Sequence, residues 1–270
     1  MSPERATLLP LAETLPQHLH TRRLGRSLRT YDVIDSTNPT ATRWAHEGAP
    51  HGSLVIAEQQ TAGRGRQGRT WHAATGQNLL FSLVLRPDLP PTHFNLITLA
   101  ASVAVAETIA SLGAPFFPQI KWPNDILLDS QKCCGMLLES SLASERDAVV
   151  VLGIGLNVNQ RDFPDELDAT ATSLCLQTGR PLQRAPLLAS LLTHLENDLD
   201  SLADDQGAAV RQAYTKRLAG LGKFITLRFA GRTDTVTGRL LGIDDLGALR
   251  LETAEGIQLF HAGEVTTHAL

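Results

Sequence analysis

The sequence predicts an α+β protein in two parts, a larger unit of strands and helices followed by a small module of short strands. Three observations carry this prediction. Apolar runs of strand length alternate with helical stretches as far as residue 218, glycines interrupt the chain at 220–222, and hairpin-like alternation begins at Lys223. A chain of 270 residues can form one large and one small domain. We therefore expect a lead-in segment at 1–28, a larger domain at 29–220 and a small domain at 221–270.

Strand signals recur through the larger domain. Residues 78–86 are apolar on both faces and therefore predict a central strand. The expected strands are residues 31–34, 53–58, 78–86, 119–121, 125–129, 135–140 and 148–158.

Helix signals lie between these strands. Asn38 can cap a helix that has Pro39 at its first position and runs to residue 44. A second helix, 94–112, ends at Gly113. A third, 186–202, places its leucines on one face and precedes a fourth at 208–218. Residues 1–28 have only weak helical character.

Short alternating strands follow the glycine break. They are expected at 224–227, 236–240, 249–251 and 257–260, with turn signals at 244–247 and 254–256. About fifty residues of such hairpins predict a small SH3-like barrel.

Composition limits the function classes. The formal net charge is −4, so the molecule as a whole is not built to hold nucleic acid electrostatically. No stretch near the N-terminus resembles a signal peptide, and we expect no membrane span. Three cysteines are too few for a disulfide scaffold, which favours reduced thiols and a cytoplasmic location.

The most informative segment is a loop in which glycine and arginine alternate. Glycine lets the backbone turn and approach a ligand, while arginine supplies forked cationic donors that match carboxylate and phosphate. Its natural complement is a compact polyanion; the alternative is a solvated linker or a nonspecific RNA-binding segment. Three like charges and no apolar anchor predict that residues 62–70 are mobile without a ligand. We call this the Gly/Arg loop; it comprises Gly63, Arg64, Gly65, Arg66, Gln67, Gly68 and Arg69.

Other polar segments stand beside predicted strands. Asp-Ser-Thr-Asn at 35–38 offers hydroxyl and amide groups, although such residues also serve simply as caps. Lys-Trp-Pro-Asn-Asp at 121–125 has a backbone fixed by proline, and its last two residues can bind the loop or a hydrated metal, or form only a turn. Lys132 follows the next turn, where a solvated surface lysine is the commoner outcome.

Several enzyme classes are excluded. The glycines of 149–159 lack the third glycine and the following helix of a dinucleotide fingerprint, so they instead mark close approach of a ligand or backbone. No G-x-S-x-G elbow, zinc-ligand spacing or Walker A ending is present.

Taken in order, these segments resemble the biotin protein ligase family from Tyr31 to the C-terminus. The matching motifs are D-S-T-N at 35–38, Q-x-A-G-R-G-R-x-G-R at 60–69, Trp71, K-W-P-N-D at 121–125, K-x-x-G at 132–135 and G-x-G-x-N at 153–157.

The resemblance implies a mixed sheet flanked by helices, of the class II aminoacyl-tRNA synthetase/biotin ligase type, followed by an SH3-like domain. It implies a two-step reaction. Biotin and Mg-ATP give biotinyl-5′-adenylate, and a lysine of a biotin carboxyl carrier protein then takes the biotinyl group. Because about 28 residues precede the first strand, we expect a monofunctional ligase that binds no DNA, either a monomer or a homodimer.

The resemblance also assigns residues. Lys132, Arg64 and Arg66 are the expected catalytic residues, placed at the reacting carboxylate and phosphate. Asn124 is expected either at adenine or at the metal. The expected biotin-binding residues are Ser36, Thr37, Asn38, Gln60, Gly63, Arg64, Arg66, Lys132, Gly135, Gly153 and Gly155. The expected nucleotide-binding residues are Arg66, Arg69, Trp71, Asn124, Lys132 and Asn157; no metal ligand is assigned.

Two alternatives remain. A lipoate ligase or octanoyltransferase shares the catalytic fold, but the complete Gly/Arg loop together with residues 121–125 favours biotin. A nucleic-acid-binding protein is disfavoured by the acidic balance, and a steep salt dependence of duplex binding would be its signature.

Overall fold

The computed structural model describes residues 11–113, 117–142, 148–231 and 233–267. The first ten residues of the expected lead-in segment lie outside the described residues.

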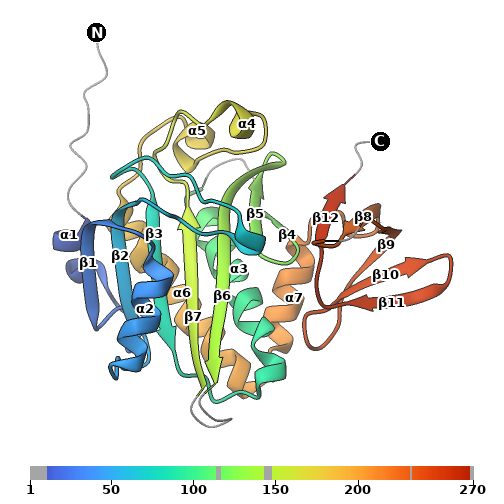
Figure 1. Ribbon diagram of the computed structural model, residues 1–270, viewed down its shortest axis with the longest axis horizontal. Coiled ribbons are helices and arrows are strands. Elements are labelled where there is room, and N and C mark those ends of the chain that lie inside the picture. Colours follow the sequence, from blue (N-terminus) through green and yellow to red (C-terminus); the bar gives the residue numbers. More distant parts are fainter. Residues whose placement is uncertain (1–10, 114–116, 143–147, 232, 268–270) are drawn as a thin grey trace.

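A seven-stranded mixed sheet forms the centre of the larger domain (Figure 1). Its order is β1-β2-β3-β7-β6-β5-β4; the β1–β2 pair is parallel and the other pairs are antiparallel. All seven predicted strands are confirmed, and β3 is buried along its whole length, as expected for an interior strand. The strands are β1 (Leu28–Ile34), β2 (Ser53–Gln60), β3 (Leu79–Leu85), β4 (Gln119–Lys121), β5 (Asp125–Leu128), β6 (Gln131–Leu142) and β7 (Ala148–Leu156).

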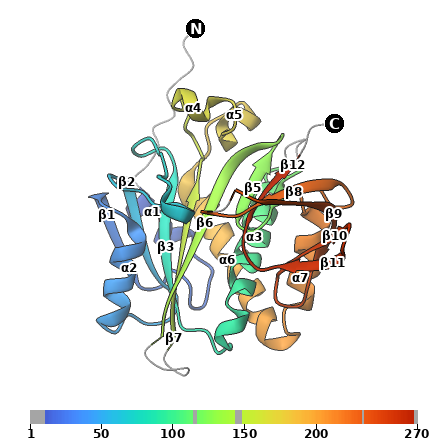
Figure 2. The ribbon, with the colours of Figure 1, turned by 45° about the vertical axis from the view of Figure 1, so that its right-hand side comes forward.

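Helices cover both faces of this sheet (Figures 1 and 2). On one face, α3 (Asn95–Ala110) lies between the sheet and the pair α6 (Arg184–Asp204) and α7 (Ala208–Arg217). On the other face, α2 (Thr37–His46) packs on β2, β3 and β7. The predicted leucine face of α6 is confirmed because six of its seven leucines are fully buried and Leu199 is partly buried.

Helix α3 belongs to an apolar stretch that the sequence analysis passed over. The 20 residues Pro91–Ala110 are long and apolar enough to cross a membrane by length and composition, with a mean hydropathy of 1.4. In the fold, 72% of this window is buried, and core helices pass the same test.

The start of α2 corrects the predicted cap. Ser36, not Asn38, occupies the N-cap position, and its side chain makes no capping hydrogen bond. Asn38 is buried within the first turn because the sheet engages its side-chain amide. Pro39 consequently lies later in that turn than expected.

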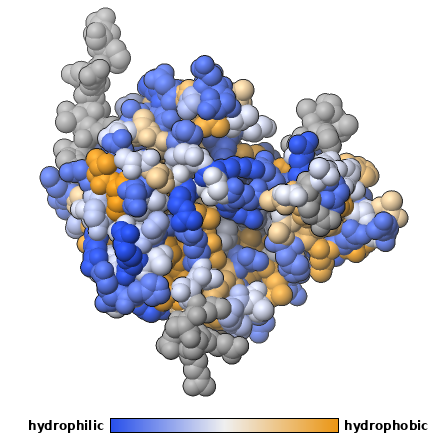
Figure 3. Space-filling model, viewed as in Figure 1, coloured by the Kyte–Doolittle hydropathy of each residue, from blue (hydrophilic) through white to orange (hydrophobic). Residues whose placement is uncertain are grey.

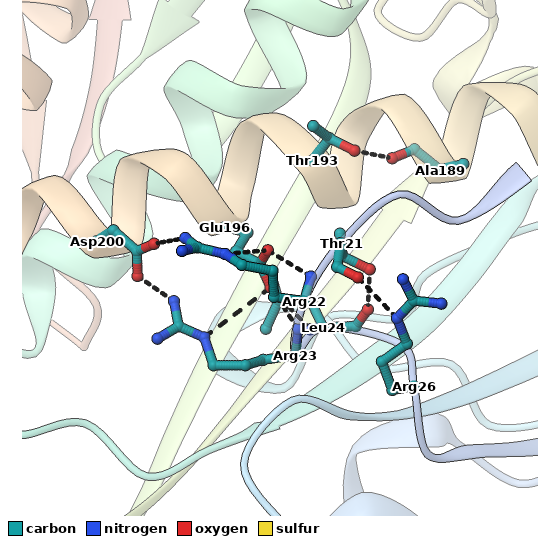
Figure 4. A network of polar contacts seen from close by, with 9 residues as sticks. All are labelled: Thr21, Arg22, Arg23, Leu24, Arg26, Ala189, Thr193, Glu196 and Asp200. Carbon is teal, nitrogen blue, oxygen red and sulfur yellow. Dashed lines mark hydrogen bonds and ion pairs between the residues drawn. The ribbon is translucent and has the colours of Figure 1, made fainter.

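The lead-in segment belongs to the core. Helix α1 (Leu11–His18) packs on α6 through buried Leu11 and Leu15. Beyond it, the buried carboxylate of Glu196 on α6 accepts the backbone N–H groups of residues 22–24 at 2.7–3.0 Å, and Asp200 pairs with two arginines (Figure 4). This network ties residues 21–26 to the helix layer.

Five strands form a second, antiparallel sheet in the order β11-β10-β9-β8-β12. The indole N–H of Trp122 donates to the carbonyl of Gly247 at 3.0 Å and so joins this module to the larger domain. Closure of the sheet into an SH3-like barrel, and the exact domain boundaries, stay predictions. The strands are β8 (Phe224–Arg228), β9 (Thr235–Ile243), β10 (Leu249–Thr253), β11 (Gly256–Phe260) and β12 (Glu264–Thr267), of which β12 was not predicted.

Candidate functional site

A cavity of about 1320 Å³ lies where the Gly/Arg loop, residues 121–125, the facing parts of β6 and β7 and the second sheet meet. In Figure 3, hydrophilic residues gather on the upper middle of this face of the molecule, with apolar surface below them. All the predicted site residues except Gly63 line this cavity. They are Ser36, Thr37, Asn38, Gln60, Arg64, Arg66, Arg69, Trp71, Asn124, Lys132, Gly135, Gly153, Gly155 and Asn157. Residues far apart in sequence therefore share one site.

Gly63 lies beside the cavity wall and has a backbone role. A side chain there would place its Cβ 2.6 Å from the carbonyl oxygen of Trp71, and the Trp71 N–H donates to the Gly63 carbonyl at 3.0 Å. Glycine is therefore needed where the two ends of the loop meet.

One end of the cavity is a fixed polar cluster. The backbone N–H of Thr37 donates to Gln60 Oε1 at 2.8 Å, and the Thr37 hydroxyl lies 3.1 Å from the same oxygen. The Asn38 amide donates to Glu139 at 2.8 Å. The segment at 35–38 therefore does more than begin a helix.

Each arginine of the Gly/Arg loop has a partner within the protein. Arg64 pairs with Glu139 at 3.0 Å, and Arg66 donates to Asn124 Oδ1 at 3.2 Å. Arg69 makes a two-pronged contact with Glu264 of β12. These partners offset the repulsion among the three like charges; the mobility of residues 62–70 stays a prediction.

These contacts shift the titration of the groups concerned. The hydrogen bond from Arg69 lowers the pKa of Glu264, and the same bond raises the pKa of Arg69. Burial lowers the pKa of Arg66, and nearby Asp125 and Glu264 oppose that shift. The pair of Arg69 and Glu264 thus favours the charged form of both groups, whereas the partner of Arg66 is the neutral side chain of Asn124.

Lys132 is a cavity residue rather than a solvated surface lysine. Its ammonium lies 2.7 Å from Asp125 Oδ1 and 5.6 Å from the centre of the Trp71 ring. Its backbone pairs with residues 170 and 172, which fixes the start of β6 beside the cavity. The surface interpretation of Lys132 is therefore wrong.

Side chains occupy the glycine-lined floor. A Cβ at Gly155 would lie 2.5 Å from the Trp71 ring, and one at Gly135 would lie 3.0 Å from the same ring. A Cβ at Gly153 would lie 2.9 Å from Asn38 Cγ. In this conformation the glycines admit Trp71 and Asn38, and the buried Trp71 Nε1 has no hydrogen-bond partner among the described residues.

Sequence reasoning missed one segment of the cavity wall. The predicted site residue Asn157 donates to the Thr172 carbonyl at 3.0 Å, so its side chain supports this neighbouring segment. That segment, which includes the short helices α4 (Asp165–Asp168) and α5 (Leu174–Thr178), gave no periodic signal. The wall residues that the sequence did not mark as site residues include Phe163, Leu167, Thr170, Ala171, Phe224, Gly263 and Glu264.

In the described part of the chain, no group of three or more His, Cys, Asp or Glu residues could hold a metal ion. Asp125 and Glu264 are acidic residues in the cavity wall, and each is engaged by a cation. The described residues therefore supply no cage for a metal by themselves.

Comparisons with known proteins agree with this arrangement. Residues 30–157 match the model described as "Biotin/lipoate A/B protein ligase family", and residues 220–266 match "Biotin protein ligase C terminal domain". "Bifunctional ligase/repressor BirA" of Bacillus subtilis is 39% identical over 249 residues, covering 92% of this chain and 76% of the relative. The chain belongs to the biotin protein ligase family.

Two further similarities extend this membership. "Biotin--[acetyl-CoA-carboxylase] ligase" of Mycobacterium tuberculosis is 36% identical, covering 89% of this chain and 90% of the relative. The solved structure "Biotin protein ligase from Aquifex aeolicus in complex with biotin and ATP" is 28% identical with a TM-score of 0.77, covering 89% of this chain and 98% of that one. The mixed sheet and the second antiparallel sheet are thus those of the family.

Proposed function

We propose that this biotin protein ligase activates biotin as biotinyl-5′-adenylate in the cavity and transfers the biotinyl group to a lysine of a biotin carboxyl carrier protein. One observation carries the proposal. The polar cluster at Thr37 and Gln60, the three loop arginines and Lys132 converge on a single cavity.

The first step joins two anions. The carboxylate oxygen of biotin attacks the α-phosphorus of ATP, the bond from that phosphorus to the bridging oxygen breaks, and pyrophosphate leaves. No strong base is needed because the carboxylate is already ionised. The site must instead position the two anions and stabilise the charge on the phosphoryl oxygens, which is work for fixed cations.

The cations for this work are held ready by anions or amides of the protein. Asp125 holds Lys132, Glu139 holds Arg64 and Glu264 holds Arg69. Ligand carboxylate and phosphate oxygens can replace these partners one for one. The exchange keeps each cation paired and releases the protein carboxylates, and the initial pairs explain how a loop with three arginines is tolerated before the ligand arrives.

Different parts of the cavity wall differ in character. The cluster at Thr37 and Gln60 offers hydrogen bonds to a polar ring, whereas the wall at Phe163 and Leu167 is apolar. We infer that the biotin ring enters at the polar end and that the flat adenine lies towards the apolar end. Trp71 would then cover biotin on the floor of glycines, and adenine would lie elsewhere than the sequence predicted.

Magnesium fits as part of the substrate. Mg²⁺ usually keeps several waters and binds through one or two carboxylates and substrate phosphates. The cavity offers such a setting: Asp125 and the side-chain amide of Asn124 lie in one wall. When bound there with ATP, the ion would neutralise phosphate charge.

In the second step, the amine of a carrier lysine attacks the acyl carbon of the mixed anhydride. An amide bond forms, AMP leaves and the amine loses a proton. We propose that the chain acts as a ligase in the cytoplasm, as a monomer or homodimer, without binding DNA or a membrane.

Biotin-dependent exchange of labelled pyrophosphate into ATP tests the proposal. We expect exchange with biotin and none with lipoate at the same concentration. Exchange supported by lipoate but not by biotin would contradict the assignment and favour the lipoate ligase alternative.

A further inference from the structure

Ser82 is a buried polar residue in an otherwise apolar strand. It lies in the middle of β3 and is 0% exposed. In the sheet it stands opposite Val55 of β2 and Gly153 of β7. Its hydroxyl oxygen lies 2.7 Å from Thr37 Oγ1 and 2.6 Å from Asn38 Oδ1. Ser82 therefore touches the polar cluster from below, out of reach of solvent.

Chemistry fixes the orientation of the two amides above it. The partners of the Asn38 Nδ2 group are the Leu137 carbonyl and the Glu139 carboxylate, which can only accept. Asn38 therefore turns its Oδ1, an acceptor, towards Ser82. The backbone N–H of Thr37 can only donate, so the Gln60 atom that faces it is Oε1. The Gln60 Nε2 group is the donor end of that amide.

The number of available protons then fixes which acceptor each hydroxyl donates to. Three oxygen–oxygen contacts surround them, at 2.6 Å (Ser82 to Asn38), 2.7 Å (Ser82 to Thr37) and 3.1 Å (Thr37 to Gln60). Two hydroxyl protons are available for three contacts. The two short contacts each need a proton, because oxygens at such a distance repel without one. Because Asn38 Oδ1 can only accept, the single Ser82 proton goes to Asn38. The contact between Ser82 and Thr37 must then take the Thr37 proton, so Thr37 donates to Ser82.

The count defines what a ligand meets. The Thr37 hydroxyl has given its proton to Ser82, so its oxygen is an acceptor. Beside it, Gln60 Nε2 is a donor. An acceptor next to a donor complements a ring in which N–H and C=O are adjacent, which is the pattern of a cyclic urea.

We propose that Ser82 is a positioning and specificity-determining residue. Because its single proton goes to Asn38, Ser82 accepts the proton of Thr37, and the Thr37 oxygen is then an acceptor for the N–H of a cyclic urea. Ser82 acts through Thr37 and does not touch the ligand. The inference rests on the proposed function because the cyclic urea is the head group of biotin.

Calorimetric binding of biotin to the whole protein, without ATP, tests the role of Ser82. Ser82→Ala removes the proton acceptor for Thr37, so the hydroxyl orientation is no longer fixed and its proton can turn either to Gln60 Oε1, 3.1 Å away, or towards the ligand. We expect the Kd for biotin to rise roughly 3- to 10-fold, within the range typical of one neutral hydrogen bond. The matched control is Ser53→Ala on the adjacent strand β2, which also removes a fully buried hydroxyl, one that donates to the Pro50 carbonyl. This variant should change the Kd for biotin less than about twofold.

A double-mutant cycle separates positioning from support of the fold. In a Thr37→Val background, Ser82→Ala should change the Kd for biotin less than about twofold. Residue 37 then has no hydroxyl for Ser82 to orient. An unchanged Kd in Ser82→Ala, an equal rise in Ser53→Ala, or a full effect in the Thr37→Val background would overturn the role of Ser82. A wild-type protein that binds no biotin would overturn the proposed function as well.

Discussion

At the residue scale, each cation that we assign to the reaction has a partner in the protein. The role of Lys132 in forming the adenylate can be tested most directly. Lys132→Ala should slow formation of the adenylate roughly 10²- to 10³-fold, because a fixed donor at developing charge stabilises a transition state by about 2.7–4 kcal/mol. The Kd for biotin should rise much less. Single-turnover kinetics with labelled ATP measures the first quantity and calorimetry the second; an unchanged adenylation rate would remove Lys132 from the reaction.

The packing of Trp71 gives a second prediction at this scale. Gly155→Ala places a methyl group 2.5 Å from the ring, so the indole must move off the floor of the cavity. We expect a higher KM for biotin and a changed tryptophan emission. Adding Trp71→Phe, with its smaller ring, should restore part of the affinity. If Gly155→Ala alone leaves the KM for biotin unchanged, Trp71 does not line the biotin site.

The sequence predicted which residues meet at the site but not their partners. Arg64, Asn124 and Lys132 were identified because their motifs are local and chemically distinctive. Glu139 and Glu264 were not, because a lone acidic residue carries no local pattern. Asn38 was placed at a cap because asparagine favours caps, and the sheet beneath it then overrode that preference.

At the element scale, the strong periodic elements were predictable and the short ones were not. Strands such as β3 and helices such as α6 have apolar patterns long enough to read. The four-residue strand β12 and the short helix α4 do not. Their positions depend on tertiary contacts, among them the contact of Glu264 with the Gly/Arg loop.

The interface between α3 and α6 contains a carboxyl group whose ionisation should oppose folding. Burial, helped by the charge of Glu107, raises the pKa of Asp198 to about 7 from an ordinary 3.8. His194 of the same helix lies 3.5 Å from Glu107. Between about pH 4 and pH 7, the native state therefore keeps a proton on the Asp198 carboxyl group, whereas the unfolded chain releases it.

A pKa raised on folding means that this group favours the native state at low pH and opposes it at high pH. Between about pH 4 and pH 7 its contribution to stability falls, and above about pH 7 the full penalty applies. Asp198→Asn should raise the Tm at pH 8 and leave it nearly unchanged near pH 4. Thermal unfolding across this range checks the sign; a lower Tm for the variant at pH 8 would contradict it.

At the scale of the whole molecule, the contact between Arg69 and Glu264 joins the Gly/Arg loop to the second sheet. Trypsin reports on this contact because the loop arginines are cleavage sites. Without ligand, Glu264→Gln should speed cleavage at residues 64–69, since one charge that holds the loop is lost. Biotin with Mg-ATP should protect the loop in wild type and variant alike.

The matched control is Glu255→Gln, in the turn between β10 and β11 of the same sheet, whose carboxylate contacts only the nearby Gln258 in the described structure. It should leave the cleavage rate unchanged. Equal cleavage of wild-type protein with and without bound adenylate would show that the loop does not close over the intermediate.

The central claim is that the cavity makes biotinyl-5′-adenylate and hands the biotinyl group to a carrier lysine. The most direct measurement is incubation of the protein with labelled biotin, Mg-ATP and a biotin carboxyl carrier domain, followed by mass spectrometry of the carrier. We predict one biotinyl group on one lysine, dependent on ATP and strongly reduced by Lys132→Ala. No label on the carrier, or label that forms equally well without ATP, would contradict the account.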